Sequence, residues 1–269
     1  MIGSLMSSPA ETYESYLVPT SFAHIAARVL DVAQPQPGER VLDAACGTGI
    51  VARRVAAIIG AQGRVVGIDL NPAMLAVARS AAAREGLTID WREGLIEALP
   101  FADGDFDLGI CQHGLQFVPD RAGAVAEMRR VLRDGGRVVV SVSQSLERHP
   151  FDHRLNDVLQ ERFGVAAISQ IYALGDADEL RALLAGAGLR DIEVVPVTFL
   201  VRNPDPKRFL TMRLTSAIAA VPSLQHMDER GREEMIAAIG EEMEEPLREY
   251  TVGDEVVRPV HVHIAWATR

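Results

Sequence analysis

Short apolar runs alternate with amphipathic stretches along the middle of the chain. The runs are rich in β-branched residues, and the stretches between them carry apolar residues at helical spacing. Strands that alternate with helices predict a mostly parallel sheet covered by helices on both faces. The predicted strands are residues 40–44, 64–69, 88–92, 106–111, 136–143, 191–200 and 255–268. The expected fold class is therefore α/β with a seven-stranded sheet.

Capping residues mark where two of the helices begin. Asn71-Pro72 is typical of a helix start, because Asn caps the free backbone N–H groups and Pro fits the first helical position. Asp176 and Glu179 have the spacing of a capping box, and Gly188 follows the last apolar position of that helix.

Two other stretches, residues 12–33 and 203–249, are helical in pattern but have no strand beside them. The second starts at Asp205-Pro206 and leads back to the last predicted strand. Such an insertion is best placed over the carboxyl edge of the sheet, where open α/β sheets bind ligands. We therefore expect a single domain over 1–269, with a core of about 36–202 plus 254–269 and a helical lid from about 11–35 and 203–253.

The composition limits the function classes. The 269 residues include 37 acidic and 27 basic side chains, for a formal net charge of −10. This balance opposes binding to a phosphate backbone, and the apolar runs are much shorter than the roughly 20 residues that cross a bilayer. Two cysteines are too few for a secreted disulfide framework, and no basic start precedes an apolar core. We expect a cytoplasmic protein with no membrane span and no nucleic-acid partner; a homodimer remains open.

The most informative segment is VLDAACGTGI at residues 41–50, where a strand runs through a glycine-rich turn into a helix. Gly47 and Gly49 allow a tight turn and a close approach of the backbone to a ligand, and the next helix offers unpaired N–H groups. The spacing Gly47-x-Gly49-x-x-Ala52 also fits a dinucleotide fingerprint, with Asp69 as the ribose-binding acid. The glycines alone do not choose the cofactor.

Asp43 favours one of the possible cofactors. A carboxylate at the mouth of the turn repels a pyrophosphate, but it suits a ligand that carries an ammonium and a sulfonium, such as S-adenosylmethionine. The alternative is that Asp43 only binds backbone amides of its own loop. For Asp69 the alternative to ribose binding is a helix cap, a position that Asn71 fills better.

Four successive motifs carry a family resemblance: VLDAACGTG, VVGIDLNPAML, EGLIEALPFADGDFDLGICQHGLQFVPD and EMRRVLRDGGRVVVSV. In this order and spacing, over about residues 40–143, they resemble class I S-adenosylmethionine-dependent methyltransferases of the ubiquinone/menaquinone C-methyltransferase-like small-molecule group. The resemblance implies a Rossmann-like fold, S-adenosylmethionine as cofactor and a small-molecule acceptor.

Position by position, the resemblance also implies a set of cofactor-binding residues. Asp43 organises the turn whose backbone holds the methionine end of the cofactor, Asp69 binds the two ribose hydroxyls, and Leu70 and Met74 flank the adenine. The complete implied set is Asp43, Ala45, Cys46, Gly47, Asp69, Leu70, Met74, Gly94, Leu95, Ile96, Cys111 and Gln112.

Two positions depart from the family pattern. Ala45 stands where members usually have the first glycine of the turn, and this is tolerable if its φ is negative. Leu95 stands where members commonly place an Asp beside the adenine amino group. Glu97 or a backbone carbonyl could replace that acceptor; a lost hydrogen bond of this kind costs on the order of 1 kcal/mol.

His113 and Tyr16 are the candidate catalytic residues. His113 follows the fourth strand and titrates near neutrality, so it could act as a general base; the alternative is a ring that packs at the strand end. Tyr16 and its neighbour Tyr13 lie in the first helical stretch and could orient the methyl donor, or simply anchor that helix. Cys111 is better explained as a small buried hydrophobe than as a nucleophile.

Two clusters have weaker functional interpretations. The pairs His149/His153 and His261/His263 could in principle ligate zinc, but they are distant in sequence and no metal is expected. Four arginines could bind an anionic substrate, although acidic neighbours favour a solvated face; they are Arg129, Arg130, Arg133 and Arg137.

The sequence as a whole favours methyl transfer from S-adenosylmethionine to a small, largely apolar acceptor, at carbon or oxygen rather than nitrogen. Two alternatives remain open at this point. One is a non-catalytic protein or a cyclase that retains the fold, which the departure at Leu95 keeps in play. The other is an NAD(P)-dependent oxidoreductase built on the same turn.

Overall fold

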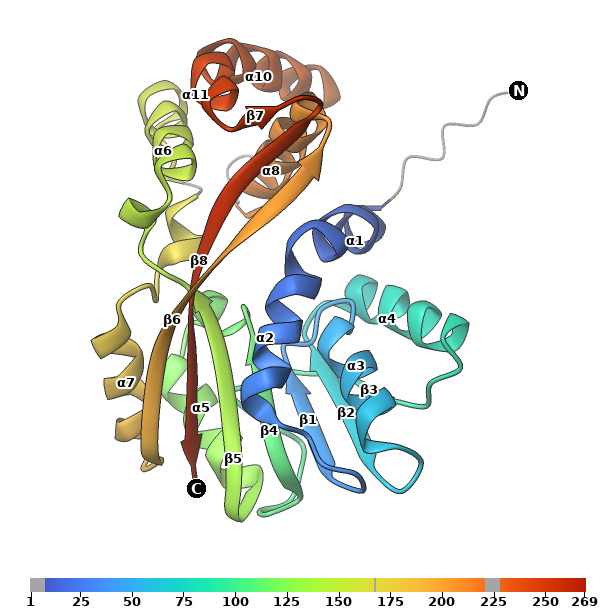
Figure 1. Ribbon diagram of the computed structural model, residues 1–269. Helices are drawn as coiled ribbons and strands as arrows, with labels where there is room; N and C mark the ends of the chain where they lie inside the picture. The colour runs from blue at the N-terminus through green and yellow to red at the C-terminus, as the bar shows by residue number, and fades with distance from the viewer. Residues whose placement is uncertain (1–7, 167, 221–227) are drawn as a thin grey trace. The chain divides into compact units, whose positions relative to one another are not determined.

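The computed structural model describes residues 8–166, 168–220 and 228–269 (Figure 1). The chain forms two compact units. Unit 1 comprises Met1–Val142, Asp176–Pro196 and His263–Arg269, and unit 2 comprises Ser143–Gly175 and Val197–Val262. The expected lid segment 203–253 lies in unit 2, and so do residues 143–175, which the sequence analysis assigned to the core.

In the part of the chain that the structure describes, eight strands form one sheet in the order β3-β2-β1-β4-β5-β8-β6, with β7 paired to β8. The sequence predicted seven, because the two-residue strand β7 is too short to show a pattern. The pairs β1–β2, β1–β4, β2–β3 and β4–β5 are parallel, which confirms the predicted mostly parallel α/β fold. The strands are β1 (Arg40–Ala44), β2 (Arg64–Asp69), β3 (Asp90–Glu93), β4 (Phe106–Gln112), β5 (Leu132–Ser143), β6 (Arg190–Pro204), β7 (Thr251–Val252) and β8 (Glu255–Thr268).

Strand β5 starts earlier than the sequence predicted because the pairing of β4 and β5 contains an irregularity. Phe106 is opposite Leu132, but Leu108 is opposite Arg137, so extra residues are accommodated on β5. Gly135, with a φ of +72°, lies in this bulge. A glycine at such a position looks like a loop in the sequence, although the strand continues through it.

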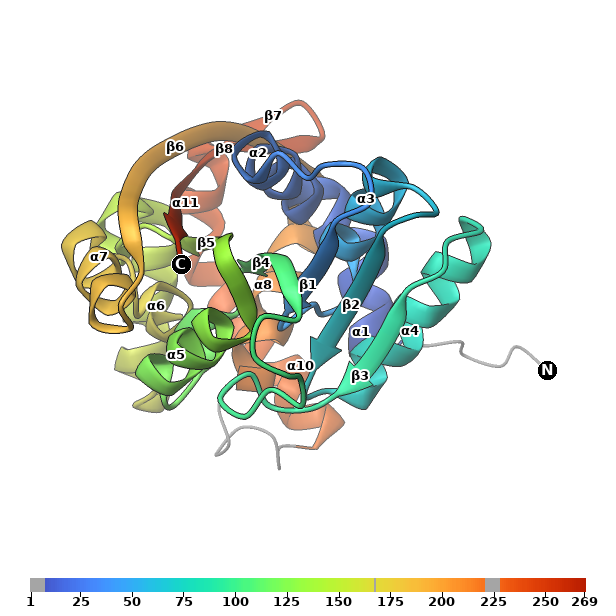
Figure 2. The same cartoon turned by 90° about the horizontal axis from the view of Figure 1, so that it is seen from below.

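Helices cover both faces of the sheet in unit 1: Figure 2 shows α2 and α3 on one face and α5 on the other. The predicted caps are present, because the Asn71 side chain accepts the N–H of Ala73, and Asp176 accepts those of Asp178 and Glu179. The helical segments of unit 1 are α1 (Pro9–Thr12), η1 (Tyr13–Phe22), α2 (Ala23–Ala33), α3 (Ile50–Ile59), α4 (Pro72–Arg84), η2 (Leu115–Phe117), α5 (Arg121–Val131) and α7 (Ala177–Gly186).

The first helical stretch, predicted over 12–33, is not a single regular α-helix. Its middle part, η1, is a π-helix that contains Pro19. Proline lacks the N–H that an α-helix needs, and π-helical turns are rare and often lie at functional sites. Tyr13 and Phe22, at the two ends of η1, stack with their ring centroids 4.9 Å apart.

Unit 2 has an apolar cluster of its own, in which Phe151, Phe209, Ile239 and Val256 are buried together. The predicted break near Pro246 occurs at Met243, between α10 and α11. Residues 221–227 of the expected lid lie outside the described part. The helical segments of unit 2 are η3 (Leu146–Arg148), α6 (Pro150–Phe163), η4 (Ser169–Tyr172), α8 (Pro206–Ala220), α10 (Glu229–Glu242) and α11 (Glu244–Glu249).

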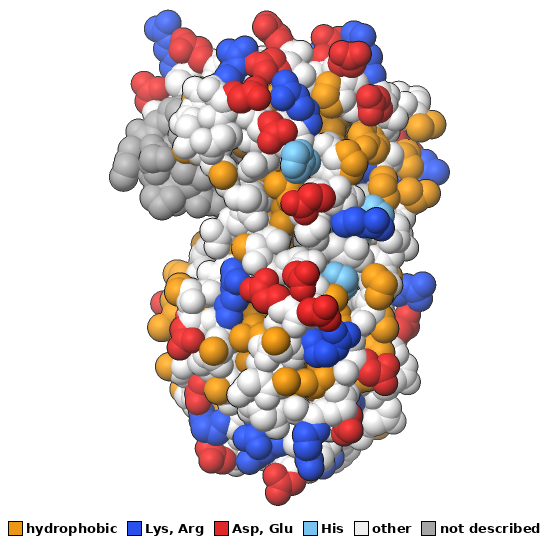
Figure 3. All heavy atoms as spheres, turned by 90° about the vertical axis from the view of Figure 1, so that its left-hand side faces the viewer, with side chains coloured by type: hydrophobic (Ala, Val, Ile, Leu, Met, Phe, Trp, Pro, Cys, Tyr) orange, Lys and Arg blue, Asp and Glu red, His pale blue; other side chains and the backbone are white. Residues whose placement is uncertain are grey.

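None of the helices in the described residues has the length and apolar character that a membrane span requires. On the face drawn in Figure 3, basic side chains are interspersed with acidic ones. That face therefore presents charges of both signs rather than a continuous basic strip.

Candidate functional site

A cavity of about 330 Å³ lies in unit 1 where the parallel strands end. The loops after β1, β2, β3 and β4 all contribute to its wall, and Tyr13 of η1 adds an aromatic ring. The carboxyl ends of parallel strands are the usual ligand site of an open α/β sheet. The volume is at the lower end of the range for small-molecule pockets.

The turn after β1 has left-handed backbone at three positions. The φ angles of Gly47 and Gly49 are +55° and +80°, as expected for glycines in a tight turn. Gly49 also leaves room for a neighbour, because a Cβ there would lie 2.2 Å from the ring of Trp91. Ala45 has a φ of +55°, so the condition under which an alanine would be tolerated here without strain, a negative φ, is not met. Residue 45 therefore has the left-handed backbone conformation that glycine usually adopts, and as an alanine it is strained by about 1 kcal/mol.

Asp43 is buried beneath the turn and lines the cavity. Its carboxylate accepts the N–H of Ala52 at 2.9 Å, so it does bind the backbone of its own loop. Burial, and then the nearby charge of Asp69, raise the pKa of Asp43 to about 7. A positive ligand in the cavity would favour the charged form of this group.

Asp69 joins the loops after β1 and β2. One carboxylate oxygen accepts the N–H of Gly47 at 2.7 Å, and the other accepts that of Asn71 at 2.9 Å. Asn71 itself caps α4. Asp69 is thus not the helix cap, and its carboxylate is held at the cavity wall.

The charges that line the cavity are of one sign. Asp43, Asp69 and Glu97 are lining residues, and no Lys or Arg is among them. Both cysteines are buried and free, and burial raises the pKa of the thiol of Cys46 above its usual range and that of Cys111 to about 12. Neither thiol is therefore a thiolate near neutral pH, and the cavity suits a cation.

Three large apolar side chains at the cavity are exposed: Leu70 at 63%, Leu95 at 46% and Phe117 at 48%. Exposed apolar groups that line a cavity mark a place where a ligand can cover them. Leu95 occupies the predicted position, and Glu97 lines the same cavity two residues later.

Two buried polar atoms in residues that line the cavity have no hydrogen-bond partner. They are the hydroxyl oxygen of Thr48 and the amide oxygen Oε1 of Gln112. The Nε2 group of Gln112 donates to the carbonyl of Phe22 at 3.3 Å. Buried polar atoms are normally paired, so both groups fit a site whose ligand supplies the partner.

His113 lines the cavity, with left-handed backbone at a φ of +53°. Its ring Nδ1 lies 3.1 Å from the hydroxyl of Ser141, and its backbone N–H donates to the carbonyl of Ser141 at 2.8 Å. The ring also meets that of Phe22 edge to face, at 5.9 Å between centroids. The side chain is thus held in position from two sides.

Tyr13 and Tyr16 differ in position. Tyr13 lines the cavity, whereas Tyr16 is buried, 2% exposed, and is not a lining residue. The sequence pattern could not distinguish the two tyrosines, because both lie in the same helical stretch.

The structure brings together nearly all of the predicted cofactor residues. All of them line the cavity except Cys111, which is fully buried behind it. The sequence analysis did not name Thr48, Gly114 or Phe117, which also line it. Thr48 stands between the two glycines of the turn, and this position in the sequence could have identified it as a lining residue. A Cβ on Gly114 would lie 2.5 Å from the Cβ of Ala45, so this glycine permits close approach of two loops.

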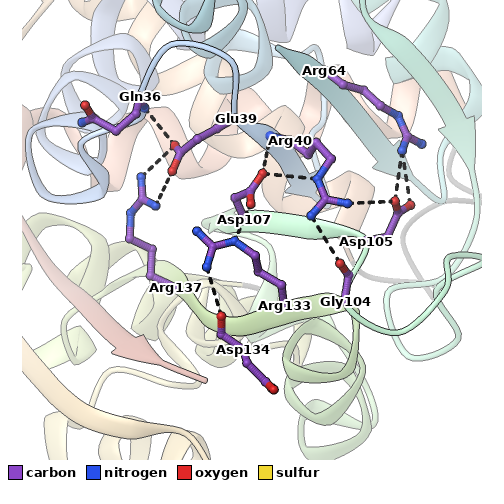
Figure 4. Close-up of polar contacts among 10 residues, drawn as sticks. All are labelled: Gln36, Glu39, Arg40, Arg64, Gly104, Asp105, Asp107, Arg133, Asp134 and Arg137. Carbon is purple, nitrogen blue, oxygen red and sulfur yellow. Dashed lines mark hydrogen bonds and ion pairs between the residues drawn. The ribbon is translucent and has the colours of Figure 1, made fainter. Parts of the chain in front are cut away.

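The arginine cluster is paired with acids rather than open to a ligand, as Figure 4 shows for two of its members. Arg137 binds Glu39 at 2.7 Å, and Arg133 binds Asp107 at 2.5 Å. Arg130 binds Glu127 and Asp103. Arg129 donates to the carbonyl of Gly188. Because carboxylates and carbonyls already pair with these arginines, the structure favours the solvated face over the alternative of an anionic-substrate site.

The histidines considered for zinc do not form a metal site. The rings of His149 and His261 lie 5.3 Å apart, but Nε2 of His149 faces the backbone N–H of His261, at 3.3 Å. Among the described residues, no group of three or more His, Cys, Asp and Glu side chains could hold a metal ion.

The chain has recognisable relatives. The family described as Methyltransferase domain matches residues 42–140, which include the glycine-rich turn and all lining residues of the cavity except Tyr13. Residues 42–140 are thus similar to a methyltransferase domain, as the four sequence motifs indicated.

Two curated proteins are similar to the domain. The 2-phytyl-1,4-naphtoquinone methyltransferase of Synechococcus elongatus is 39% identical over 107 residues, which are 39% of this chain and 46% of that protein. The ubiquinone/menaquinone biosynthesis C-methyltransferase UbiE of Stenotrophomonas maltophilia is 44% identical over 110 residues, 40% of this chain and 44% of that protein. The chain thus matches less than half the length of each.

A solved structure shares the fold over most of the chain. The YcgJ protein from Bacillus subtilis superposes with a TM-score of 0.62 at 19% identity, over 92% of this chain and 98% of that one. This likeness confirms the Rossmann-like fold.

Proposed function

We propose that the protein transfers a methyl group from S-adenosylmethionine to a small, largely apolar acceptor. The observation that carries this proposal is the cavity at the strand ends, whose charged lining residues Asp43, Asp69 and Glu97 are all acidic. A ligand with a sulfonium and an ammonium is attracted there, whereas the pyrophosphate of NAD(P) would be repelled. The oxidoreductase alternative is therefore disfavoured.

The residues of the cavity suit each part of this cofactor. The carboxylate of Asp69 can accept hydrogen bonds from ribose hydroxyls while it keeps the N–H groups of Gly47 and Asn71. Leu70 and Leu95 offer exposed apolar surface to the adenine. The unpartnered oxygens of Thr48 and Gln112 are acceptors for the ammonium at the methionine end.

When bound, S-adenosylmethionine supplies a methyl group on a sulfonium, whose leaving group is neutral. The C–S bond breaks as the bond to the acceptor forms, so the main task of the protein is alignment. Holding two reactants at near-attack distance supplies roughly 7 to 11 kcal/mol of barrier reduction. Tyr13, a lining residue from the proposed N-terminal lid segment, is placed to orient the donor, rather than Tyr16.

His113 is the proposed general base. An acceptor that loses a proton on methylation needs a group to take it, and the ring of His113 is fixed beside the cavity by Ser141 and Phe22. The proton of the acceptor moves to the imidazole, and the methyl group takes its place at carbon or oxygen.

The relatives suggest a class of acceptor. Their names refer to 2-phytyl-1,4-naphtoquinone and to ubiquinone and menaquinone biosynthesis. A reduced quinone ring is apolar and carries hydroxyls that a base can deprotonate, so we propose acceptors of this type. Two buried free cysteines and the net charge of −10 support a cytoplasmic enzyme that acts on a free small molecule rather than on nucleic acid.

Methyl transfer can be tested with S-adenosylmethionine labelled in its methyl group and a panel of phenols and reduced naphthoquinones. We expect labelled product from at least one reduced naphthoquinone. His113→Ala should lower turnover at least about tenfold with the affinity for S-adenosylhomocysteine nearly unchanged. Bound cofactor without product from any acceptor would instead favour the non-catalytic or cyclase alternative, and full activity of the variant would remove His113 from the mechanism.

A further inference from the structure

The lining of the cavity in unit 1 changes in character along the sheet. The strand order is β3-β2-β1-β4, so the loops after β3 and β2 form one end of the cavity, and those after β1 and β4 form the other. The exposed apolar side chains of Leu70 and Leu95 belong to the loops after β2 and β3. The buried carboxyl of Asp43 and the unpartnered oxygens of Thr48 and Gln112 belong to β1, β4 and the turn after β1. The buried polar groups are thus gathered at one end of the cavity.

This polarity selects one orientation for a nucleoside that carries an amino acid. The charged amino-acid part needs the buried polar groups at the β1 and β4 end, and the flat base needs the apolar side chains at the other end. Strand β2 lies between β3 and β1, so Asp69 at its end is placed for the ribose between the two parts. Met74 of α4 also lines the cavity. The base therefore lies against Leu70, Met74 and Leu95, which we call the apolar end.

The apolar end offers few free hydrogen-bond acceptors to the edge of a base. The side-chain oxygen of Asn71 already accepts the N–H of Ala73 at 2.9 Å. The backbone carbonyl of Leu95 already accepts the N–H of Ala98 at 3.3 Å. Apart from the ribose-binding carboxylate, the remaining side-chain acceptor among the described lining residues at this end is the carboxylate of Glu97.

Water reaches this end of the cavity, because Leu70 and Leu95 are 63% and 46% exposed. Glu97 is only half-buried. A hydrogen bond from a base to its carboxylate replaces one made to water, so the net contribution of that bond to affinity is small. The amino group of adenine can keep its own water here. The 6-position of a bound purine therefore meets apolar side chains and solvent rather than a buried acceptor.

We propose that the apolar end binds a purine without distinguishing the substituent at its 6-position, so that the cavity accepts cofactors with an alkylated amino group as well as it accepts S-adenosyl compounds. A site rejects the wrong ligand strongly only when that ligand leaves a buried polar group unpaired, and apolar contacts discriminate weakly. Leu95 is the specificity-determining residue, because it places an apolar side chain and no side-chain acceptor at this end. The inference rests on the proposed function, since it concerns the base of the same cofactor.

Calorimetric titration of the full chain with S-adenosylhomocysteine and with its 6-dimethylamino derivative tests this proposal. The derivative keeps the ring nitrogens as acceptors but has no N–H group at the 6-position. We expect it to bind no more than about threefold more weakly than S-adenosylhomocysteine. A larger loss would overturn the proposal and leave the cofactor assignment intact. Absence of binding by S-adenosylhomocysteine itself would overturn both.

Two substitutions at Leu95 test whether this residue sets the tolerance. Leu95→Asp supplies an acceptor, so this variant should bind S-adenosylhomocysteine at least about fivefold more tightly than the dimethylamino derivative. Leu95→Met keeps an apolar side chain and is the matched control, so its two affinities should have the same ratio as in the parent. The side chain of Leu95 is 46% exposed, so neither variant should affect folding. Equal affinities in Leu95→Asp would contradict the role of Leu95.

Glu97→Gln tests the competing acceptor at the same end. The ratio of the two affinities should be the same in this variant as in the parent, because a half-buried carboxylate contributes little to binding of the amino group. A ratio that falls in Glu97→Gln would show that Glu97 distinguishes the 6-substituent, and it would overturn the proposal.

Discussion

Single backbone positions decide how closely the loops of the cavity approach each other. Ala45 carries a Cβ at a φ of +55°, and the missing Cβ of Gly114 leaves the space in which that methyl group lies. The methyl group of Ala45 therefore fits only because Gly114 has no side chain. The sequence predicted the shape of the turn from its glycines, but it could not show that Ala45 adopts a glycine-like conformation, since alanine by itself favours negative φ.

This pairing predicts a coupling between two substitutions. Ala45→Gly should stabilise the protein by about 1 kcal/mol, because it removes a strained Cβ. Gly114→Ala should destabilise it by about 1 to 3 kcal/mol, because the new methyl group would overlap that of Ala45. In the double variant much of that cost should disappear. Urea titrations of the four proteins measure this, and strictly additive effects would contradict the proposed contact.

The buried carboxyl of Asp43 predicts a pH-dependent affinity. Its pKa of about 7 applies to the free cavity, and a cationic ligand favours the charged form. Binding should therefore release a proton, and affinity for S-adenosylmethionine should rise from about pH 6 to about pH 8. Calorimetry in buffers of different ionisation enthalpy detects the proton. Asp43→Asn should remove most of the effect; an unchanged pH dependence in that variant would show that the carboxyl of Asp43 is not its source.

The strands and helices of unit 1 bring the lining residues of the cavity together. Some of these elements could be predicted from the sequence, and others could not. The parallel strands β1, β2 and β4 were predictable from apolar runs bounded by polar turns, so the residues that follow them were too. The π-helical form of η1 was not, because its sequence resembles an amphipathic α-helix with one proline. Within η1, Tyr13 lines the cavity, whereas Tyr16 is buried and is not a lining residue.

The attachment of η1 to the rest of unit 1 gives an element-scale prediction. Arg53 of α3 is 6% exposed and binds Glu14 of η1 at 2.6 Å, and it also binds Glu85. Removing it with Arg53→Met leaves Glu14 without its ion-pair partner, and such a loss costs about 3 to 5 kcal/mol. Hydrogen exchange should become faster in residues 9–22, while β1 and β2 remain protected.

A surface pair on α2 serves as the control for that experiment. Arg28 binds Asp31 at 3.1 Å and its side chain is 60% exposed. Arg28→Met should leave the exchange of residues 9–22 unchanged, because exposed ion pairs contribute little. Equal protection of this segment in Arg53→Met and in the parent protein would show that Arg53 does not anchor η1.

The loop after β3 gives a second prediction at this scale. Leu95 is the position at which the family resemblance implied an Asp, and its side chain is exposed at the cavity. Leu95→Asp should restore an acceptor for the adenine amino group and tighten S-adenosylhomocysteine binding by about 1 kcal/mol, or about fivefold. Leu200→Asp, at another exposed leucine, is the control and should have no effect. Weaker binding by Leu95→Asp would mean that Glu97 or a backbone carbonyl already accepts the hydrogen bond of the adenine amino group.

At the scale of the whole molecule, the sheet extends through chain segments that belong to both units. Strands β6 and β8 begin in one unit and end in the other, so their sequences carry no linker-like break. This continuity explains why the sequence indicated a single domain with an inserted lid, whereas the residues divide into two compact units. Residues 143–175 were assigned to the core because their helix α6 comes soon after β5, separated from it only by η3, as in an α/β repeat.

The most direct test of the account is a calorimetric titration of the full chain with S-adenosylmethionine and, separately, with NADH. An acidic cavity at the strand ends predicts saturable binding of the sulfonium compound near neutral pH, and no saturable binding of the dinucleotide. Tight binding of NADH, with no heat from S-adenosylmethionine, would contradict the assignment of this cavity.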